Sequence, residues 1–423
     1  MKSNITKSNI TKSNATKSNS GTIKLGYGQG CLVLPAGEEA EVVLPEELPP
    51  AGSGEIERSL DQSFGESLDE FQGCRSASIL VSDITRPAPS HLMLPPLIKR
   101  MMELGIKNPR IVFALGTHRR MTSDEEAYLL KDCLSLPHSQ HDPQACVSLG
   151  RTRRGTPVEI LESVASSDLI VATGNIEYHY YAGYSGGAKA VLPGVSSEAS
   201  VIKNHELMRD PAATTGRLDS PVRLDMEDAA KVAGLDFVLN TVLNSRKEIV
   251  LSVAGDFIQA HRSGAAVVDQ MYRSPVEPAE IVVTCAGGRP KDLNLFQAQK
   301  ALDNAKNAAL PGGTIILLAE CCEGLGHPVF ERWAREAASA EECWERFGRE
   351  YEFGGHKAAF LARESMRHHL ILVSSLPKEK AEMCFMTPAK TLEEALSLAR
   401  ERQGRDARML VMPHGNLTLA VRK

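Results

Sequence analysis

The chain has 423 residues, of which 42% are hydrophobic and 24% are charged, and its formal net charge is -5 at pH 7. This composition is typical of a globular protein, and the length predicts two domains of roughly 150–200 residues each. No basic patch indicates nucleic-acid binding, and no apolar run approaches the roughly 18 residues of a membrane span. The nine cysteines show no C-x-x-C spacing, and with no signal peptide we expect a reducing, cytoplasmic location. We therefore predict a cytoplasmic protein with no nucleic-acid and no membrane partner.

The first 20 residues are a low-complexity repeat in which Lys-Ser-Asn recurs with a period of five. Because Lys, Ser, Asn and Thr cannot bury a core, we expect residues 1–20 to form a disordered tail. From Thr22 the chain contains three short stretches that are typical of β-strands. Residues 55–69 are polar, which indicates a helix or a loop.

Polar side chains follow directly after three apolar runs in the first half of the chain. Asp83 and Arg86 come after the run that ends at Val81, and His118 comes after the run that ends at Leu115. A third run, 168–172, leads into a glycine-rich stretch. Since the carboxyl ends of parallel strands share one edge of a sheet, we expect these side chains to converge there.

The glycine-rich stretch Asn175–Gly194 holds a histidine, His179, and a lysine, Lys189. Glycines let a backbone approach a ligand closely, so Ser185, Gly186 and Gly187 are candidates for an anion-binding cradle. The stretch lacks the Gly-Lys-Ser/Thr of a Walker loop and the GxGxxG of dinucleotide-binding proteins. A predicted helix that begins at Ser196 or Ser197 then carries His205.

Each of these residues has a plainer interpretation when it is taken singly. A lone histidine is more often a core or surface residue than a catalyst, and Asp83 with Arg86 could be a capping aspartate beside a surface arginine. Three histidines at equivalent positions, each just beyond a strand, favour a functional site.

A proline-rich segment, Gln270–Glu280, predicts the boundary between two domains. Beyond it, apolar runs at 280–285, 314–318, 369–373 and 408–412 alternate with helical stretches, as in a doubly wound sheet. We therefore predict an α/β fold of two domains with mainly parallel sheets, residues 21–274 and 275–423, with the active site in the cleft between them.

Five motifs of this chain together resemble those of the lactate racemase family, the nickel-pincer-nucleotide enzymes. They are Asp83-x-x-Arg86, Gly116-Thr-His118-Arg, the block from Glu177 through His179 and Lys189 to Gly194, Asn204-His205, and Asp292-x-Asn-Leu-Phe296-Gln297-x-x-Lys300. The resemblance covers nearly the whole chain after the tail.

This resemblance implies a 2-hydroxyacid racemase or epimerase with a pyridinium mononucleotide cofactor, which carries nickel held by two sulfurs and one carbon. By the resemblance, Lys189 tethers the cofactor covalently and His205 supplies the protein ligand to nickel. His118 and His179 are the acid/base pair, and Asp83 supports the cofactor or Arg86. Arg86, Gln297 and Lys300 hold the substrate carboxylate. The first domain then binds the cofactor, the second contributes substrate-binding residues, and the enzymes that synthesise the cofactor are partners.

The chemistry agrees with these residue types. Removing hydride from a 2-hydroxy acid gives a planar keto acid, and the acceptor has to be a cofactor because no side chain can take hydride. Histidine has a pKa near the working pH, so it can take the hydroxyl proton and return it. The planar guanidinium of arginine can bind a carboxylate with two hydrogen bonds, and imidazole is a natural nickel ligand.

One position departs from the family pattern, because Phe296 stands where the lactate enzyme has a tyrosine. We therefore expect a 2-hydroxy acid other than lactate. Three alternatives remain open: a zinc hydrolase that uses His118, His179 and His205, a nicotinamide dehydrogenase, and a catalytically silent binding protein with the same fold.

Overall fold

The computed structural model describes residues 15–17, 22–107 and 109–423. Of the predicted tail, only Ala15–Lys17 is described, as the short strand β1, and the rest of it lies outside the described residues. Backbone contacts divide the chain into two units. The N-terminal unit comprises Glu47–Met271 and Gly348–Glu352, and the C-terminal unit comprises the described residues up to Glu46, Tyr272–Phe347 and Phe353–Lys423.

The N-terminal unit is built on a six-stranded sheet in the order β14-β13-β10-β5-β6-β7. Its strands are β5 (Ala77–Ser82), β6 (Arg110–Ala114), β7 (His138–Gln140), β10 (Leu169–Asn175), β13 (Phe237–Leu243) and β14 (Ile249–Gly255). All neighbours are parallel except β13 and β14, which are antiparallel. The sequence pattern predicts β5, β6 and β10, but not the β13–β14 pair.

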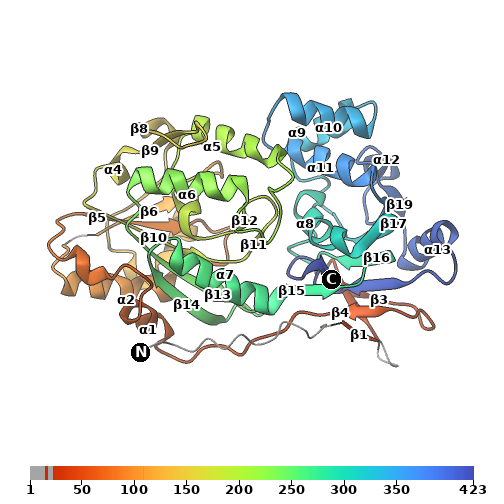
Figure 1. Ribbon diagram of the computed structural model, residues 1–423, viewed down its shortest axis with the longest axis horizontal. Helices are drawn as coiled ribbons and strands as arrows, with labels where there is room; N and C mark the ends of the chain where they lie inside the picture. Colours follow the sequence, from red (N-terminus) through yellow and green to blue (C-terminus); the bar gives the residue numbers. More distant parts are fainter. Residues whose placement is uncertain (1–14, 18–21, 108) are drawn as a thin grey trace. The chain divides into compact units, whose positions relative to one another are not determined.

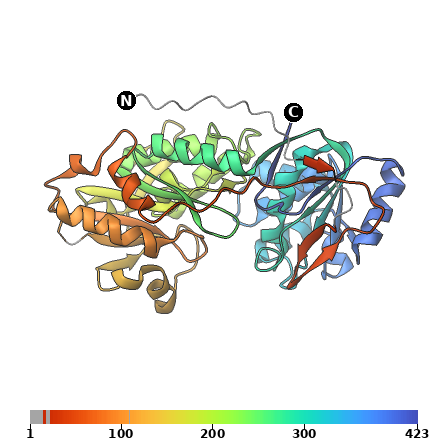
Figure 2. The same cartoon turned by 90° about the horizontal axis from the view of Figure 1, so that it is seen from below.

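Helices cover both faces of this sheet, as Figures 1 and 2 show for α2 on one face and for the green helices α6 and α7 on the other. The helices are α1 (Glu55–Asp61), α2 (Ser90–Glu103), α3 (Ser123–Leu130), α4 (Glu162–Ala165), α5 (Glu198–His205), α6 (Pro221–Ala233) and α7 (Gln259–Tyr272). Ile79 and Val81 of β5 are buried in one core with Leu97 of α2 and Phe113 of β6. The alternation of the strand residues between two covered faces explains why these strands read as continuous apolar runs.

The C-terminal unit has a seven-stranded sheet in the order β1-β4-β20-β16-β17-β18-β19. Apart from β1, these are β4 (Glu41–Val43), β16 (Ala279–Cys285), β17 (Ala309–Leu318), β18 (His369–Val373), β19 (Thr387–Ala389) and β20 (Met409–Met412). Every pair is parallel except β1 with β4. The helices are α8 (Leu295–Ala305), α9 (Pro328–Glu336), α10 (Ala340–Arg349), α11 (Gly355–Ser365), α12 (Lys378–Glu382) and α13 (Leu392–Gln403).

Four two-stranded pairs complete the strands of the described residues. They are β2 (Lys24–Tyr27) with β3 (Gly30–Val33), β8 (Cys146–Arg151) with β9 (Pro157–Leu161), β11 (Tyr178–His179) with β12 (Gly183–Tyr184), and β15 (Arg273–Val276) with β21 (Leu419–Arg422). The prediction of an α/β fold with two mainly parallel sheets is confirmed. Within the described residues, no helix has the length and apolar character that crossing a membrane requires.

The predicted domain limits differ from the structure at the start of the chain. Residues 22–46 fall in the first predicted domain, but they pack with the C-terminal unit. Strand β4 pairs in parallel with β20, and Leu25 of β2 is fully buried in the core formed by β16, β17 and α13. Figure 2 shows this red β2–β3 hairpin beside the strands of that unit. The other boundary lies at Met271, close to the predicted Gln270–Glu280 segment.

Candidate active site

The three predicted strand ends lie next to one another in the N-terminal unit. Strand β5 pairs in parallel with β10 on one side and with β6 on the other. Asp83 follows β5, His118 follows β6, and the stretch that contains His179 follows β10. The three therefore meet at the carboxyl edge of the sheet, where α/β proteins bind their ligands.

Asp83 and His118 form a hydrogen-bonded pair, with 3.0 Å between Oδ2 and Nδ1. Burial opposes the ionised form of Asp83, but the hydrogen bond and charge of His118, a hydrogen bond from Thr85 and the charge of Arg86 lower the pKa of Asp83 to about 2. An ionised carboxylate can only accept, so Nδ1 of His118 donates, and in the neutral ring the lone pair is then on Nε2. Support of the cofactor or of Arg86 by Asp83 stays a prediction, and the hydrogen bond to His118 is a contact that the sequence did not predict.

His118 also borders a cavity of about 400 Å³ that Gly116, Thr117 and Arg120 line with it. Its side chain is 33% exposed, whereas that of Asp83 is 5% exposed. The arrangement thus has a buried anion that orients the ring and an imidazole that solvent or a ligand can reach. This is the geometry of a positioned general base.

His179 lies on the short hairpin of β11 and β12. Its ring stacks on Tyr180 at 5.2 Å between centroids and meets the ring of Tyr181 edge-on at 4.4 Å. The backbone N–H of Ala182 donates to Nδ1 over a long 3.4 Å. The hairpin turn requires glycine at 183, where φ is 75° and a Cβ would lie 1.9 Å from the carbonyl oxygen of Arg217.

The buried Tyr181 is the centre of a cluster that contains the other two predicted residues, the half-buried Lys189 and the buried His205. The Nζ of Lys189 lies 5.7 Å from the centroid of the Tyr181 ring, and the Tyr181 hydroxyl is 3.1 Å from Nε2 of His205. Burial, together with the charge of Lys189, lowers the pKa of His205 to about 3. His205 is therefore a neutral imidazole, which is the form that binds a metal ion.

Arg86 lies near both groups of residues, because its charge acts on each. Burial raises the pKa of the Tyr181 phenol, and the charge of Arg86 opposes this rise. The charge of Arg86 also helps to lower the pKa of Asp83. The half-buried Arg86 is thus a cation beside both the Asp83–His118 pair and the Tyr181 cluster.

Ser185 and Gly187 are turned into the protein, and their predicted role as an anion cradle is not supported. The hydroxyl of Ser185 donates to the carbonyl of Asn175, and the N–H of Gly187 donates to Oδ1 of Asn240. At Gly186 an added Cβ would lie 2.8 Å from the same Asn240 oxygen. The glycines permit close packing of the loop on β13, and the Ser185 and Gly187 donors are already used.

A buried arginine holds the same loop from the other side. Arg223 of α6 is fully buried and donates to the carbonyl oxygens of Ala182, Tyr184 and Gly186. His261 of α7 donates to the carbonyl oxygen of Ser185 at 2.8 Å. These donors fix the backbone between His179 and Lys189.

We expect Arg223→Met to lower the free energy of unfolding by about 3 kcal/mol or more, because several buried carbonyls lose their donors at once. Urea denaturation measures this change. The control is Arg153→Met, since Arg153 pairs with Asp228 but its side chain is 84% exposed, and an exposed ion pair contributes less than about 1 kcal/mol. Equal stability losses in the two variants would contradict the role of Arg223.

The C-terminal unit carries the predicted substrate-side residues on the first turns of α8. Asn294 caps this helix by accepting the N–H of Gln297, and Nζ of Lys300 donates to Oε1 of Gln297 at 2.8 Å. The ring of Phe296 meets those of His327 at 5.7 Å and Phe353 at 6.1 Å between centroids. Gln297 and Lys300 thus present an amide and an ammonium side by side.

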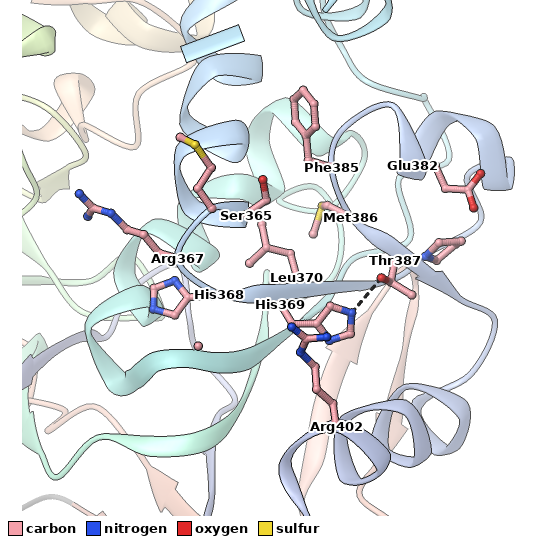
Figure 3. A pocket seen from close by; sticks show the side chains of 13 residues that line it. Ser365, Arg367, His368, His369, Leu370, Glu382, Phe385, Met386, Thr387 and Arg402 are labelled. Carbon is pink, nitrogen blue, oxygen red and sulfur yellow. Dashed lines mark hydrogen bonds between the residues drawn. The ribbon is translucent and has the colours of Figure 1, made fainter. Parts of the chain in front are cut away.

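A second cavity of about 400 Å³ lies in the C-terminal unit, at the amino ends of β18 and β19 (Figure 3). There the ring of His369 is 2.9 Å from the hydroxyl of Thr387, with Arg402 beside them. None of the predicted site residues lines this cavity. It lies at the edge of the sheet opposite to the one where parallel α/β sheets bind ligands.

Comparison with known proteins identifies the family of this chain. The model of the lactate racemase N-terminal domain matches residues 25–216, and that of the lactate racemase C-terminal domain matches residues 275–420. The chain belongs to the lactate racemase family. The resemblance predicted from the motifs is confirmed, and membership makes the chain an isomerase of the racemase type, acting on a lactate-like substrate.

Two curated relatives and two solved structures illustrate the similarity. The lactate racemase of Thermoanaerobacterium thermosaccharolyticum is 35% identical over 376 residues, which is 85% of this chain and 88% of that protein. The lactate racemase of Lactiplantibacillus plantarum is 34% identical over 376 residues, which is 85% of this chain and 89% of that protein. The lactate racemase apoprotein structure from T. thermosaccharolyticum has a TM-score of 0.88 at 32% identity and covers 95% of this chain and 100% of that one. A Thermotoga maritima protein shares the fold at a TM-score of 0.65 and 19% identity, covering 89% and 100%.

Within this family member, the zinc-hydrolase alternative finds no support. Among the described residues, no group of three His, Cys, Asp or Glu side chains could hold a metal ion. His118 is paired with Asp83, His179 packs between tyrosine rings, and His205 bonds to a tyrosine hydroxyl. A zinc hydrolase needs three protein ligands around one open position.

Two tyrosines of the site escaped sequence analysis. Tyr181 appears in the glycine-rich stretch only as one aromatic residue among several, although it contacts His179, Lys189 and His205. Tyr351 places its hydroxyl 3.1 Å from Nδ1 of His205, across 146 residues of sequence. No local pattern marks Tyr351, whereas the aromatic run around His179 was a signal for Tyr181.

Proposed function

We propose that this enzyme interconverts the enantiomers of a 2-hydroxy acid other than lactate, using a nickel-pincer nucleotide attached to Lys189. The observation that carries the proposal is the cluster around Tyr181. It gathers an amine, a neutral imidazole and a candidate acid/base around one buried tyrosine ring. The N-terminal unit would then bind the cofactor, which the cofactor-synthesis enzymes supply.

The residues present fit this group. The pincer brings two sulfurs and one carbon to its nickel, so the protein needs to supply only one further ligand. His205 is a single buried imidazole that stays neutral at working pH, and the described residues offer no three-ligand set that would compete. Lys189, whose charge acts on His205, provides the amine for covalent attachment. Ligation would require the hydroxyl of Tyr181 to release Nε2 of His205.

Held by Lys189 and His205, the cofactor would supply the hydride chemistry at the 2-hydroxy carbon, through a planar 2-keto acid, that no side chain can supply. The chain supplies the proton transfers. His118 has its proton on Nδ1 and a lone pair on Nε2, because Asp83 accepts at Nδ1. His179 accepts at Nδ1, so in its neutral form its proton lies on Nε2. One ring is therefore set to take the hydroxyl proton while the other is set to give one.

The substrate carboxylate is assigned to three residues. Arg86 offers a planar pair of donors, and Gln297 and Lys300 offer an amide and an ammonium. We expect Lys300→Ala to raise KM more than it lowers kcat. The carboxylate does not react, so its binding stabilises the bound substrate and the transition state equally.

The proposal is tested with protein made alongside the cofactor-synthesis enzymes. Nickel content and the loss of optical rotation are measured with a panel of single-enantiomer 2-hydroxy acids. Racemisation of at least one acid other than lactate by nickel-loaded protein supports the proposal, and racemisation of lactate alone would overturn the substrate assignment. Nickel-loaded protein that racemises none of them points to a silent binding protein, and turnover that does not depend on nickel would overturn the cofactor assignment.

Phe296 is expected to set the substrate preference. Its ring packs against His327 and Phe353, and Nζ of Lys357 lies 5.0 Å from its centroid. A phenyl ring has no hydroxyl to bond a polar substrate group, but it accepts an apolar one. We expect the native enzyme to have a higher kcat/KM for 2-hydroxy acids with larger side chains than for lactate. Phe296→Tyr should shift the ratio toward lactate by about 10-fold, and equal ratios in both proteins would contradict this role.

A further inference from the structure

The segment Gly348–Glu352 packs with the N-terminal unit, although the residues on both sides of it in sequence belong to the C-terminal unit. It carries Tyr351, whose hydroxyl lies 3.1 Å from Nδ1 of His205. The two rings meet at 6.0 Å between centroids with an interplanar angle of 61°. The imidazole of His205 therefore has a tyrosine hydroxyl at each of its nitrogens, Tyr351 at Nδ1 and Tyr181 at Nε2.

The two nitrogens of His205 differ in what lies beyond them. The Nε2 side leads to Tyr181, whose ring is 5.7 Å from Nζ of Lys189. The Nδ1 side leads to Tyr351, whose hydroxyl is 3.1 Å from that nitrogen. If Lys189 holds the cofactor, Nε2 is the nitrogen that faces it.

A neutral imidazole donates from one nitrogen and accepts at the other. A metal ligand needs a lone pair, so Nε2 can bind nickel only in the tautomer that has its proton on Nδ1. That proton then requires an acceptor, because His205 is buried away from water. The oxygen of Tyr351 is at hydrogen-bond distance from it.

We propose that Tyr351 is a positioning residue of the nickel site, which accepts a hydrogen bond from Nδ1 of His205 and so holds the ring in its metal-binding tautomer. This inference rests on the proposed function, in which His205 is the nickel ligand. The Tyr181 hydroxyl donates to Nε2 in the apoprotein and gives up this hydrogen bond when nickel binds. Tyr351 keeps its hydrogen bond in both states.

The variant Tyr351→Phe removes the hydroxyl and keeps the ring. Partners of metal-binding histidines typically contribute about 10–100-fold to metal affinity. We therefore expect nickel-loaded Tyr351→Phe to lose its metal to EDTA at least about 10-fold faster than native protein does. The measurement is the nickel content per chain over time. The mass adduct on the Lys189 peptide should remain, because Tyr351 does not touch Lys189 in this scheme.

Tyr178→Phe is the matched control. Its hydroxyl is also hydrogen-bonded and part-buried, but it donates to Asp269 at 2.8 Å. We expect this variant to retain nickel as the native protein does. If Tyr351→Phe also retains nickel at the native rate, the proposal is overturned. If His205→Ala retains nickel as well as native protein does, it is the proposed function that fails.

A second measurement uses the apoprotein, so it does not require the cofactor, and its main result comes from native protein even if the variant does not fold. Nitrogen-15 NMR of the histidine-labelled apoprotein reports the tautomer of His205, assigned by its absence in His205→Ala. We expect the proton of native His205 on Nδ1, with a fraction moving to Nε2 in Tyr351→Phe. A native protein with the proton on Nε2 would overturn the proposal, even if Tyr351→Phe does not fold.

Discussion

Lys189→Ala is expected to yield protein that carries no cofactor adduct and has no measurable racemase activity. The proposed covalent attachment needs a primary amine, and Lys189 offers one 5.7 Å from the centroid of the Tyr181 ring, where its charge acts on His205. The native protein, made with the cofactor-synthesis enzymes, should show an added mass on the peptide that contains Lys189. The measurement is mass spectrometry of the digested protein, with nickel content on the same samples.

Two further variants serve as controls. One tests whether the amine of Lys189 or only its positive charge is needed, and the other tests whether loss of a nearby lysine has the same effect. Lys189→Arg keeps a cation close to His205 but offers no primary amine, so it should lack the adduct as completely as Lys189→Ala does. Lys203→Ala removes an exposed lysine of α5 that pairs with Glu206, and it should keep both adduct and activity. An active enzyme with an unmodified Lys189 peptide would refute covalent attachment while leaving the fold assignment intact.

The positions of Asp83, His118 and His179 at one sheet edge could be predicted because they follow from strand order alone. Parallel strands bring their carboxyl ends together, and apolar runs show where each strand ends. The helix of Gln297 and Lys300 was predictable for a similar reason, since residues three apart share a helix face. These inferences need only local patterns and a general rule of topology.

The pairings within the site depend on side-chain directions, which local patterns do not contain. Asp83 could have capped a helix or bonded Arg86, and only the fold brings it within 3.0 Å of His118. Ser185 and Gly187 were predicted to form an anion cradle, but the Ser185 hydroxyl donates to the carbonyl of Asn175 and the N–H of Gly187 donates to Asn240 on β13. Strand β13 itself was not predicted, so its effect on the loop could not be.

The contact of Tyr351 with His205 and the packing of the N-terminal strands on the C-terminal unit escaped prediction because the partners are distant in sequence. Tyr351 reaches His205 across 146 residues, and β4 joins a sheet whose neighbouring strand, β20, lies near the other end of the chain. Such contacts form when burial outweighs the entropy of closing a long loop, and that cost grows only slowly with loop length. Sequence distance is therefore a poor guide to which segments complete a site.

The variants His118→Ala and His179→Ala should each lose activity toward a different enantiomer of the substrate. In a two-base scheme each ring removes the hydroxyl proton from one enantiomer, so His118→Ala and His179→Ala should each lower racemisation by about 10²-fold or more. In an acid-quenched single turnover, each variant should form keto acid from one enantiomer and not from the other. Both variants should retain nickel, unlike His205→Ala. If either variant keeps full racemase activity, or if both fail with the same enantiomer, the two-base assignment is wrong.

Asp83→Asn tests whether the buried carboxylate orients His118. An amide can donate as well as accept, so His118 is no longer restricted to the form with its proton on Nδ1, and we expect about a 10-fold or larger loss that mirrors His118→Ala in its enantiomer preference. Because the folded pKa of Asp83, about 2, lies below its unfolded value of about 3.9, the stabilisation from this pair is fully present above about pH 4. It is lost as the pH falls towards 2. Native protein should therefore show an acid-dependent fall in stability over this range that is smaller in Asp83→Asn, as thermal melts would show. A variant with native kinetics for both enantiomers would mean that Asp83 serves the fold alone.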